Sequence, residues 1–306
     1  MILCCGEALI DMIPNADGAF APHTGGAIFN TAIGIGRQGA TVGLLSGISN
    51  DVFGDLLSEK LEKSQVAKQY LIRSDRPTTL AFVKLVDGKA SYAFYDENTA
   101  GRMIADKDLP DHLPKGIKAL FFGGISLAVE PCADTYLSAL KQYSRNRIIM
   151  VDPNIRPSFI EDESRYRDRM RNILDCADII KISDEDLDWL DGSKRDRDTK
   201  AEEMLGNKTK LVCLTLGGDG VKAFHENGVQ CAVRAPKKDV VDTVGAGDAF
   251  NAGVLTHLDR NHILTAHGVA SLSENDLSAM LEFASHFAAD TVTRAGSDPA
   301  WHFEIR

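Results

Sequence analysis

The chain has 306 residues, of which 44% are hydrophobic, enough to bury the core of one large domain. Its formal net charge of −10 excludes a nucleic acid or an anionic membrane surface as the main partner, but it allows a locally positive pocket. Residues 1–11 lack the basic start of a signal peptide, no apolar run has membrane-spanning length, and the six cysteines show no Cys-x-x-Cys pairing, so we expect a cytoplasmic protein with reduced thiols.

Short apolar runs alternate with amphipathic stretches along most of the chain. We expect buried strands at residues 2–5, 41–45, 118–122, 147–151, 179–182 and 211–216. We expect helices at residues 27–38, 52–63, 131–144, 164–176 and 184–190. This alternation predicts an α/β fold in which helices cover both faces of a mostly parallel sheet.

One region departs from this alternation. Residues 78–86 and 90–95 have strand-like patterns and are joined by Asp87-Gly88-Lys89, which is a hairpin signal. Together with residues 19–21 they predict a small sheet beside the main one. We expect about 12–24 and 77–100 to form this sheet as an insertion in a single domain that spans 1–306.

Several residues near the start of the chain are candidates for a ligand pocket. Asp11 follows the first strand, and open α/β sheets bind ligands beyond the carboxyl ends of their strands. A carboxylate there can accept hydrogen bonds from two ligand hydroxyl groups, whereas the alternative is a turn carboxylate that faces water. Gly25 and Gly26 allow the backbone to approach a ligand closely, and Asn30 offers both a donor and an acceptor.

Residues 34–39 contain the pattern G-x-G-x-x-G, which is the fingerprint of a dinucleotide site. Here the pattern ends a predicted helix and no strand directly precedes it. We therefore interpret these glycines as positions of close helix packing, with Gly39 capping the helix. This interpretation argues against a dinucleotide-dependent oxidoreductase.

Residues 242–250, DTVGAGDAF, carry the most specific signal. Gly245, Ala246 and Gly247 leave three successive backbone N–H groups free of bulky side chains, just before an apolar run that predicts a helix at 249–258. Such a turn binds anions, because unpaired N–H groups and the positive end of the helix dipole converge there. Asp248 follows at once, where it can accept a hydroxyl proton while the turn holds developing phosphoryl charge. The alternative is a glycine-rich helix start whose acidic residue only stabilises the helix.

The same segment resembles the second signature of the PfkB (ribokinase-like) family of carbohydrate kinases. GGAIFNTAIGIGRQG at 25–39, followed by GISNDVFG at 47–54, resembles the first signature. The resemblance covers essentially the whole chain and is strongest toward bacterial fructokinases. It implies a three-layer α/β/α sandwich with a mostly parallel central sheet and a small β-sheet lid, which in relatives often pairs two copies into a homodimer.

The resemblance also implies roles for individual residues. Asp11, Gly25, Gly26 and Asn30 match the sugar-binding positions, and Arg156, in a segment similar to D-x-N-x-R, would face the substrate and the transferring phosphate. The nucleotide side matches Ser183, Thr215, Gly217, Gly220 and Gly247. Asp186 would hold Mg²⁺ indirectly, although Ser183 and Asp186 stand where many members have Asn and Glu. A K⁺ site would involve Asp242, Val244, Thr291 and Gly296.

We therefore expect an ATP-dependent sugar kinase that uses Mg²⁺ and acts on a primary hydroxyl of a neutral ketohexose, most simply fructose. Ketodeoxygluconate kinases carry an arginine after an aromatic pair on the lid, whereas this chain has Asp96 and Glu97 after Phe94-Tyr95. Acidic residues there disfavour a carboxylate substrate. The alternatives are a kinase for 2-keto-3-deoxygluconate, ribose or a nucleoside, and a catalytically silent sugar-binding regulatory protein.

Overall fold

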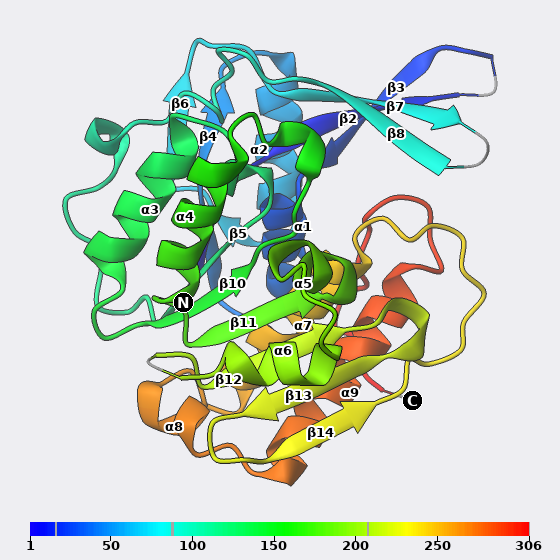
Figure 1. Ribbon diagram of the computed structural model, residues 1–306. Coiled ribbons are helices and arrows are strands. Elements are labelled where there is room, and N and C mark those ends of the chain that lie inside the picture. The colour runs from blue at the N-terminus through cyan, green and yellow to red at the C-terminus, as the bar shows by residue number, and fades with distance from the viewer. Residues whose placement is uncertain (16, 87–88, 207, 306) are drawn as a thin grey trace.

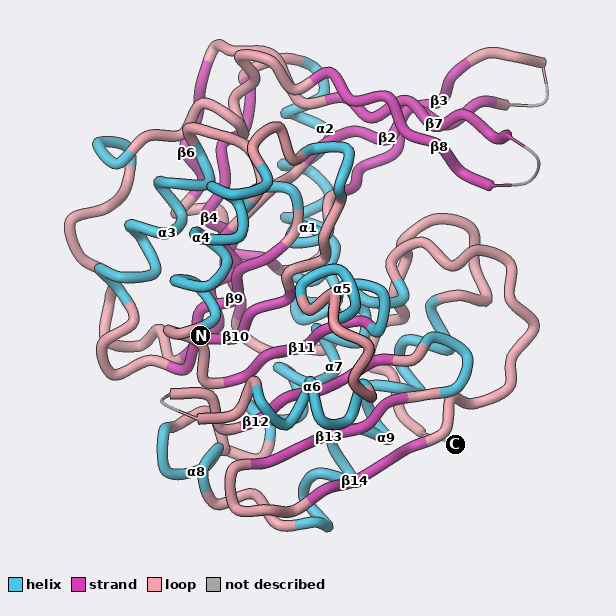
Figure 2. Tube along the Cα trace, in the orientation of Figure 1, coloured by secondary structure: helices cyan, strands magenta, loops and turns pink. Residues whose placement is uncertain are grey.

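The computed structural model describes residues 1–15, 17–86, 89–206 and 208–305, and for residues 83–92 it describes no side chains. Figures 1 and 2 show a large sheet between two layers of helices, and a small sheet that projects away from it. Among the described residues, no helix is long and apolar enough to cross a membrane.

The large sheet has ten strands within the described residues, in the order β14-β13-β12-β11-β10-β9-β1-β4-β5, with β6 paired to β4. The strands β12, β11, β10, β9, β1, β4, β5 and β6 are parallel, whereas β13 and β14 extend one edge in antiparallel fashion. Their bounds are β1 (Ile2–Cys5), β4 (Val42–Ser49), β5 (Val66–Ala67), β6 (Leu71–Ser74), β9 (Ala119–Gly123), β10 (Ile148–Asp152), β11 (Ile179–Ser183), β12 (Leu211–Thr215), β13 (Val221–His225) and β14 (Gln230–Val233).

The direction of strand addition reverses at β1. The chain first adds β4 on one side of β1, where Cys5 is opposite Leu45, and later adds β9 on the other side, where Cys5 is opposite Phe122. In sheets of this type, a crevice for ligands forms at the carboxyl ends of the strands beside such a reversal.

Alternate residues of each buried strand enter different cores. Cys4 and Phe121 belong to one core and Cys5 and Phe122 to the other. The first core contains α1 (Ala27–Arg37), α2 (Val52–Lys63), α7 (Ala246–Arg260), α8 (Ala266–Ala270) and α9 (Glu274–Thr291). The second contains α3 (Cys132–Tyr143), α4 (Glu163–Leu174), α5 (Asp184–Leu190) and α6 (Arg197–Glu203), which lie in front of the sheet in Figure 1. The predicted three-layer fold is therefore confirmed.

The small sheet has the order β3-β2-β7-β8, with bounds β2 (Leu9–Pro14), β3 (Phe20–Gly25), β7 (Leu80–Val86) and β8 (Lys89–Tyr95). β7 and β8 pair antiparallel as the hairpin signal predicts, although Asp87 and Gly88 lie outside the described residues. Asp11 lies beyond the carboxyl end of β1, as predicted, and the structure places it within the strand β2, between His23 of β3 and Ala81 of β7. The small sheet begins at Leu9, with three residues between the end of β1 and the start of β2.

The glycines at 34–36 serve helix packing, as predicted. A Cβ on Gly34 would lie 2.7 Å from Cβ of Ala252 on α7, and a Cβ on Gly36 would lie 2.1 Å from the carbonyl oxygen of Ser64. Gly39 follows α1 with a φ of +80°, which suits a helix cap. α1 and α7 can therefore approach closely, and this contact joins the two ends of the chain.

Candidate active site

A cavity of about 330 Å³ lies at the carboxyl ends of β1, β10 and β11, and residues of the small sheet border it. The predicted site residues that line it are Asp11, Gly26, Asn30, Arg156, Val244, Gly245, Gly247 and Asp248. They come from widely separated parts of the chain, so the fold has brought together the sugar-side and catalytic candidates.

Asp248 lies in the first turn of α7, next to the predicted anion turn. Gly245 precedes the helix with a φ of +81°, and a Cβ there would lie 2.2 Å from the Ser297 hydroxyl oxygen, so this position requires glycine. The Asp248 side chain is buried, and this burial raises its pKa to about 7. A carboxylate with a pKa near neutrality is suited to accept a proton.

Asn30 holds the Asp248 carboxylate in place. Its Nδ2 donates a hydrogen bond to Asp248 Oδ2 over 2.9 Å, and the Thr31 hydroxyl donates to the Asp248 carbonyl over 3.2 Å. Among the described residues, the Asp248 side chain makes no other hydrogen bond, so Oδ1 remains for a substrate hydroxyl group. Asn30 thus contacts the base directly, which the sequence did not predict.

Asp11 faces the cavity from β2, and burial raises its pKa to about 6. Gly25 and Gly26, which lie beside Asp11, have no space for a side chain because other atoms of the protein are too close. A Cβ on Gly25 would lie 2.1 Å from Asp11 Oδ2, and one on Gly26, whose φ is +106°, would lie 2.9 Å from the Glu7 carbonyl oxygen. The structure therefore explains these glycines by packing around Asp11 and Glu7, in addition to the close ligand approach predicted from the sequence.

Glu7 is a cavity residue that the sequence reasoning missed. Its carboxylate accepts hydrogen bonds from the backbone N–H groups of Ala27, over 3.0 Å, and Ser126, over 3.3 Å. Burial raises the pKa of this carboxyl group. Glu7 thereby ties the start of α1 to the 3₁₀ turn η2 (Ile125–Leu127), which forms another part of the cavity wall.

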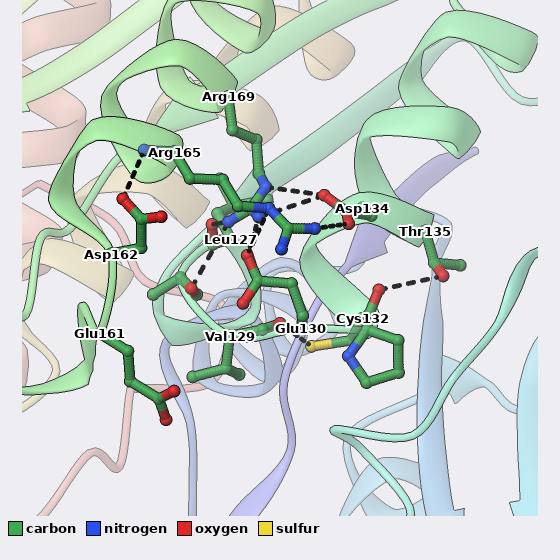
Figure 3. Close-up of polar contacts among 12 residues, drawn as sticks. Leu127, Val129, Glu130, Cys132, Asp134, Thr135, Glu161, Asp162, Arg165 and Arg169 are labelled. Carbon is green, nitrogen blue, oxygen red and sulfur yellow. Dashed lines mark hydrogen bonds and ion pairs between the residues drawn. The ribbon is translucent and has the colours of Figure 1, made fainter.

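A network of ion pairs fixes this part of the wall, as Figure 3 shows. Arg169 of α4 is buried, donates to the Leu127 carbonyl over 3.2 Å, and pairs with Glu130 and Asp134. Arg165 pairs with the same two carboxylates. These contacts attach the segment from η2 to the start of α3 to the helix α4, and they fix the position of Ile125 in the cavity wall.

A buried polar cluster at the base of the cavity was also missed. Lys181 Nζ lies 3.1 Å from Asp152 Oδ2, and Asn251 Nδ2 donates to the same oxygen over 2.7 Å. Asp152 was noted only as the start of the segment that ends at Arg156. Arg156 itself is exposed at the cavity, where one of its N–H groups donates to the Ile155 carbonyl.

Of the predicted nucleotide residues, Gly247 lines this cavity. The other four lie along the same edge of the sheet but do not line it: Ser183, Thr215, Gly217 and Gly220. Ser183, at the end of β11, is in register with Thr215 at the end of β12, and Gly217 and Gly220 follow in a turn with φ of +55° and +113°. Ser183 caps α5 by accepting a hydrogen bond from the Asp186 N–H group. The Asp186 carboxylate accepts a hydrogen bond from the Ile155 N–H group. Its pKa is raised mainly by burial and, to a smaller extent, by the negative charge of the nearby Asp152.

The two segments of the predicted K⁺ site are adjacent. Asp242 accepts hydrogen bonds from the N–H groups of Val244, over 3.0 Å, and Gly296, over 2.9 Å. Thr291 is buried at the end of α9, with its hydroxyl donating to the Phe287 carbonyl. The carboxylate of Asp242 is therefore used to join the loops, so an ion here would rely on backbone carbonyl groups.

The donor set suits Mg²⁺ held largely by phosphates. No group of three His, Cys, Asp or Glu residues able to hold a metal occurs in the part of the chain that the structure describes. Mg²⁺ commonly uses one or two carboxylates together with phosphate and water oxygens. Asp152 fits that role, because its Oδ1 is buried without a hydrogen-bond partner among the described residues, and its charge lies near enough to Asp186 to help raise the pKa of that second carboxyl group.

A larger cavity of about 400 Å³ lies among α4, α5 and α6. Its cations are already paired: Arg167 donates to the carbonyls of Trp189 and Leu190, and Lys200 contacts Asp188 and the Asp191 carbonyl. It contains no acid or base comparable to Asp248. The smaller cavity is therefore the candidate active site.

Comparisons with known proteins identify the family of this chain. The family model described as pfkB family carbohydrate kinase matches residues 1–302. The chain is 47% identical to a fructokinase of Rhizobium leguminosarum bv. trifolii, over 90% of this chain and 85% of that protein. A crystal structure of Xylella fastidiosa fructokinase with bound ATP has a TM-score of 0.90 and 26% identity, over 97% of this chain and 93% of that one. Vibrio cholerae fructokinase, in a form with bound fructose, ADP and calcium ion, has a TM-score of 0.84 and 26% identity, over 97% and 94% of the two chains.

Proposed function

Because the chain belongs to the pfkB family of carbohydrate kinases, we propose that it is a fructokinase, which transfers the γ-phosphoryl group of ATP to a primary hydroxyl group of fructose. The observation that carries this proposal is Asp248, a buried carboxylate with a pKa raised to about 7, beside the glycine turn at the start of α7. A base and an anion-binding turn in one cavity are the two features that phosphoryl transfer to a hydroxyl group needs.

Asp248 acts as the general base. Its Oδ1 accepts the proton of the sugar hydroxyl while Asn30 holds Oδ2. The sugar oxygen forms a bond to the γ-phosphorus, and the bond between that phosphorus and the bridging oxygen of ADP breaks. The backbone N–H groups of the turn at Gly245–Gly247 stabilise the charge on the transferred group, although that of Ala246 also donates to the Thr243 carbonyl over 3.3 Å.

The sugar lies against Asp11, Gly26 and Asn30, which line the cavity together. Asp11 accepts hydrogen bonds from the sugar hydroxyl groups, and its burial raises its pKa to about 6. Arg156 borders the same cavity and supplies a cation near the transferred phosphoryl group.

ATP extends from the cavity along the carboxyl ends of β11 and β12, past Ser183, Thr215 and the turn at Gly217–Asp219. Mg²⁺ would neutralise phosphate charge when bound, with Asp152 holding it through its free Oδ1 and Asp186 holding it indirectly. K⁺ would bind to backbone carbonyl groups of the two loops that the hydrogen bond between Asp242 and Gly296 joins. A Vibrio cholerae fructokinase structure in a fructose, ADP and potassium ion bound form supports the use of K⁺.

A neutral sugar fits the charges around the small sheet better than an acidic one. Arg102, the first cation after β8 in sequence, is paired with Asp96 over 3.2 Å and with Glu161 over 3.6 Å. Its charge is therefore already compensated and does not favour a substrate carboxylate. This supports fructose over 2-keto-3-deoxygluconate.

The small sheet acts as a lid on a single kinase domain, because Leu9, Asp11 and Phe94 border the cavity from β2 and β8. Two copies pair through these sheets into a homodimer. The six free cysteines fit a reducing cytoplasm.

The test measures ADP release with fructose, ribose, 2-keto-3-deoxygluconate and a nucleoside, each with Mg·ATP. We expect fructose to give the highest kcat/KM by at least tenfold, about 1.4 kcal/mol of transition-state preference. A tenfold preference for another member of the panel would refute fructose and keep the kinase. No ADP release with any of them would favour a catalytically silent sugar-binding protein.

A further inference from the structure

Lys181 is the most unusual charged residue of the sheet. It lies in β11 between Ile180 and Ile182, is 5% exposed, and faces the active-site cavity. An ion inside a parallel sheet is costly unless it is paired and fully hydrogen-bonded. The protein keeps this ammonium group at the position where the cavity meets the sheet.

The pairing of Lys181 is incomplete. Asp152 Oδ2 is its one hydrogen-bond acceptor among the described residues, at 3.1 Å, although an ammonium group has three donors. Asp152 Oδ1 and Asn251 Oδ1 are also buried without hydrogen-bond partners in that part of the chain. A salt bridge kept for stability alone would be expected to satisfy these atoms. The cluster of Lys181, Asp152 and Asn251 therefore has hydrogen-bond donors and acceptors that are available to a ligand.

The ammonium group points to the anion turn. A Cβ on Gly247 would lie 3.4 Å from Lys181 Nζ. Nζ therefore lies close to the backbone of the turn, and no side chain at Gly247 stands between them. Asp248 is the next residue and lines the same cavity. An anion held by the turn therefore lies within reach of Nζ and beside the base.

Building on the proposed kinase function, we propose that Lys181 contacts the transferring phosphoryl group. One of its free N–H donors binds a non-bridging oxygen of the γ-phosphoryl group, while Asp152 holds the ammonium from the other side. Lys181 adds a full positive charge to the backbone donors of residues 245–247, in a place where water is excluded. The chain thus supplies a fixed lysine to the phosphoryl group from a strand and without a Walker loop.

The test compares Lys181→Met with the matched variant Lys200→Met. Lys200 is also buried, at 4% exposure, but lies on α6 and pairs with Asp188, away from the active-site cavity. We expect Lys181→Met to lower kcat by about 10² to 10³, the usual cost of a lost transition-state donor, with the KM for fructose within about twofold. Lys200→Met should leave kcat within about twofold of wild type.

A binding measurement separates this role from a structural one. The non-hydrolysable analogue AMP-PNP carries a γ-phosphoryl group and ADP does not, so Lys181→Met should weaken AMP-PNP by about tenfold while ADP affinity stays unchanged. Equal weakening of AMP-PNP, ADP and fructose, or a kcat within threefold of wild type, would overturn the proposal. This binding result still tests Lys181 if the wild-type protein phosphorylates no sugar, an outcome that would refute only the kinase function.

Lys181→Met leaves Asp152 as a buried unpaired carboxylate and can prevent folding. The double variant Lys181→Met/Asp152→Asn removes both charges and keeps both volumes. We expect it to fold and, relative to Asp152→Asn alone, to show the same selective loss of AMP-PNP affinity, since the proposed function also uses Asp152 to hold Mg²⁺. A folded double variant with wild-type preference for AMP-PNP over ADP would also overturn the proposal.

Discussion

Replacing Asp248 by Asn should affect catalysis and stability in opposite directions. The amide keeps the size of the side chain, and its oxygen can still accept the hydrogen bond from Asn30. It cannot accept a proton, so we expect kcat to fall by about 10² to 10⁴, the range for loss of a general base. The affinity for fructose should remain within about twofold of wild type.

The stability effect follows from the raised pKa of Asp248. Burial raises the pKa from its ordinary 3.8 to about 7, so the folded protein binds this proton more tightly than the unfolded chain does. The stability that the Asp248 proton contributes is therefore fully present below about pH 4 and is lost as pH rises through about 7. At pH 8 the difference corresponds to about 4 kcal/mol as an upper value. Asp248→Asn removes this cost and should raise Tm at pH 8 more than at pH 5.

Two measurements check this prediction. The first is kcat/KM for fructose from pH 5 to 9, which in wild type should fall about tenfold for each pH unit below 7. The second is Tm of both proteins at pH 5 and pH 8. A variant with nearly wild-type kcat would remove Asp248 from the mechanism. A variant less stable than wild type at pH 8 would show that the carboxylate is stabilised in the cavity, contrary to our reasoning.

Three further predictions concern the sugar side. Asp11→Ala should weaken fructose by about ten- to hundredfold in a binding titration, since a hydrogen bond to a charged group contributes about 1.5–3 kcal/mol, and equal weakening of ATP would contradict a sugar contact. Gly25→Ala should give a similar fructose-selective loss, because the new methyl group would meet Asp11 Oδ2 at 2.1 Å; unchanged fructose affinity would show that Asp11 is not the contact. Amide exchange in Leu80–Val86 and Lys89–Tyr95 should slow with saturating fructose if the small sheet closes as a lid, and unchanged exchange would argue against closure.

The sequence predicted the parts of the fold whose signals are local. β1 is apolar at every position, because both of its faces are buried. The start of α7 at the glycine turn was predictable for a similar reason, since the residues of that turn are contiguous. β2 was missed because its six residues include Asp11 and Pro14, and its pairing with β3 and β7 is what makes it a strand. α9 was also missed, although Ser273 and Asp276 form a capping box at its start.

The contacts that organise the site depend on residues far apart in the chain. Asn30 and Asp248 are separated by 218 residues, and Lys181 and Asp152 by 29. No spacing in a single sequence indicates such pairs. A signal for Lys181 was nevertheless present, because a lysine inside an otherwise apolar strand must have a partner or a function.

The contact between α1 and α7 has a consequence for synthesis of the protein on the ribosome. α1 is complete at Arg37, but the helix that covers it begins only at Ala246. At ordinary translation speeds, roughly 10 to 40 s pass between the synthesis of α1 and that of α7. During this time the apolar side of α1 is exposed to chaperones and to aggregation. A premature stop codon anywhere before Ala246 would leave this surface bare, so we expect such fragments to be degraded and not to accumulate as partly folded protein.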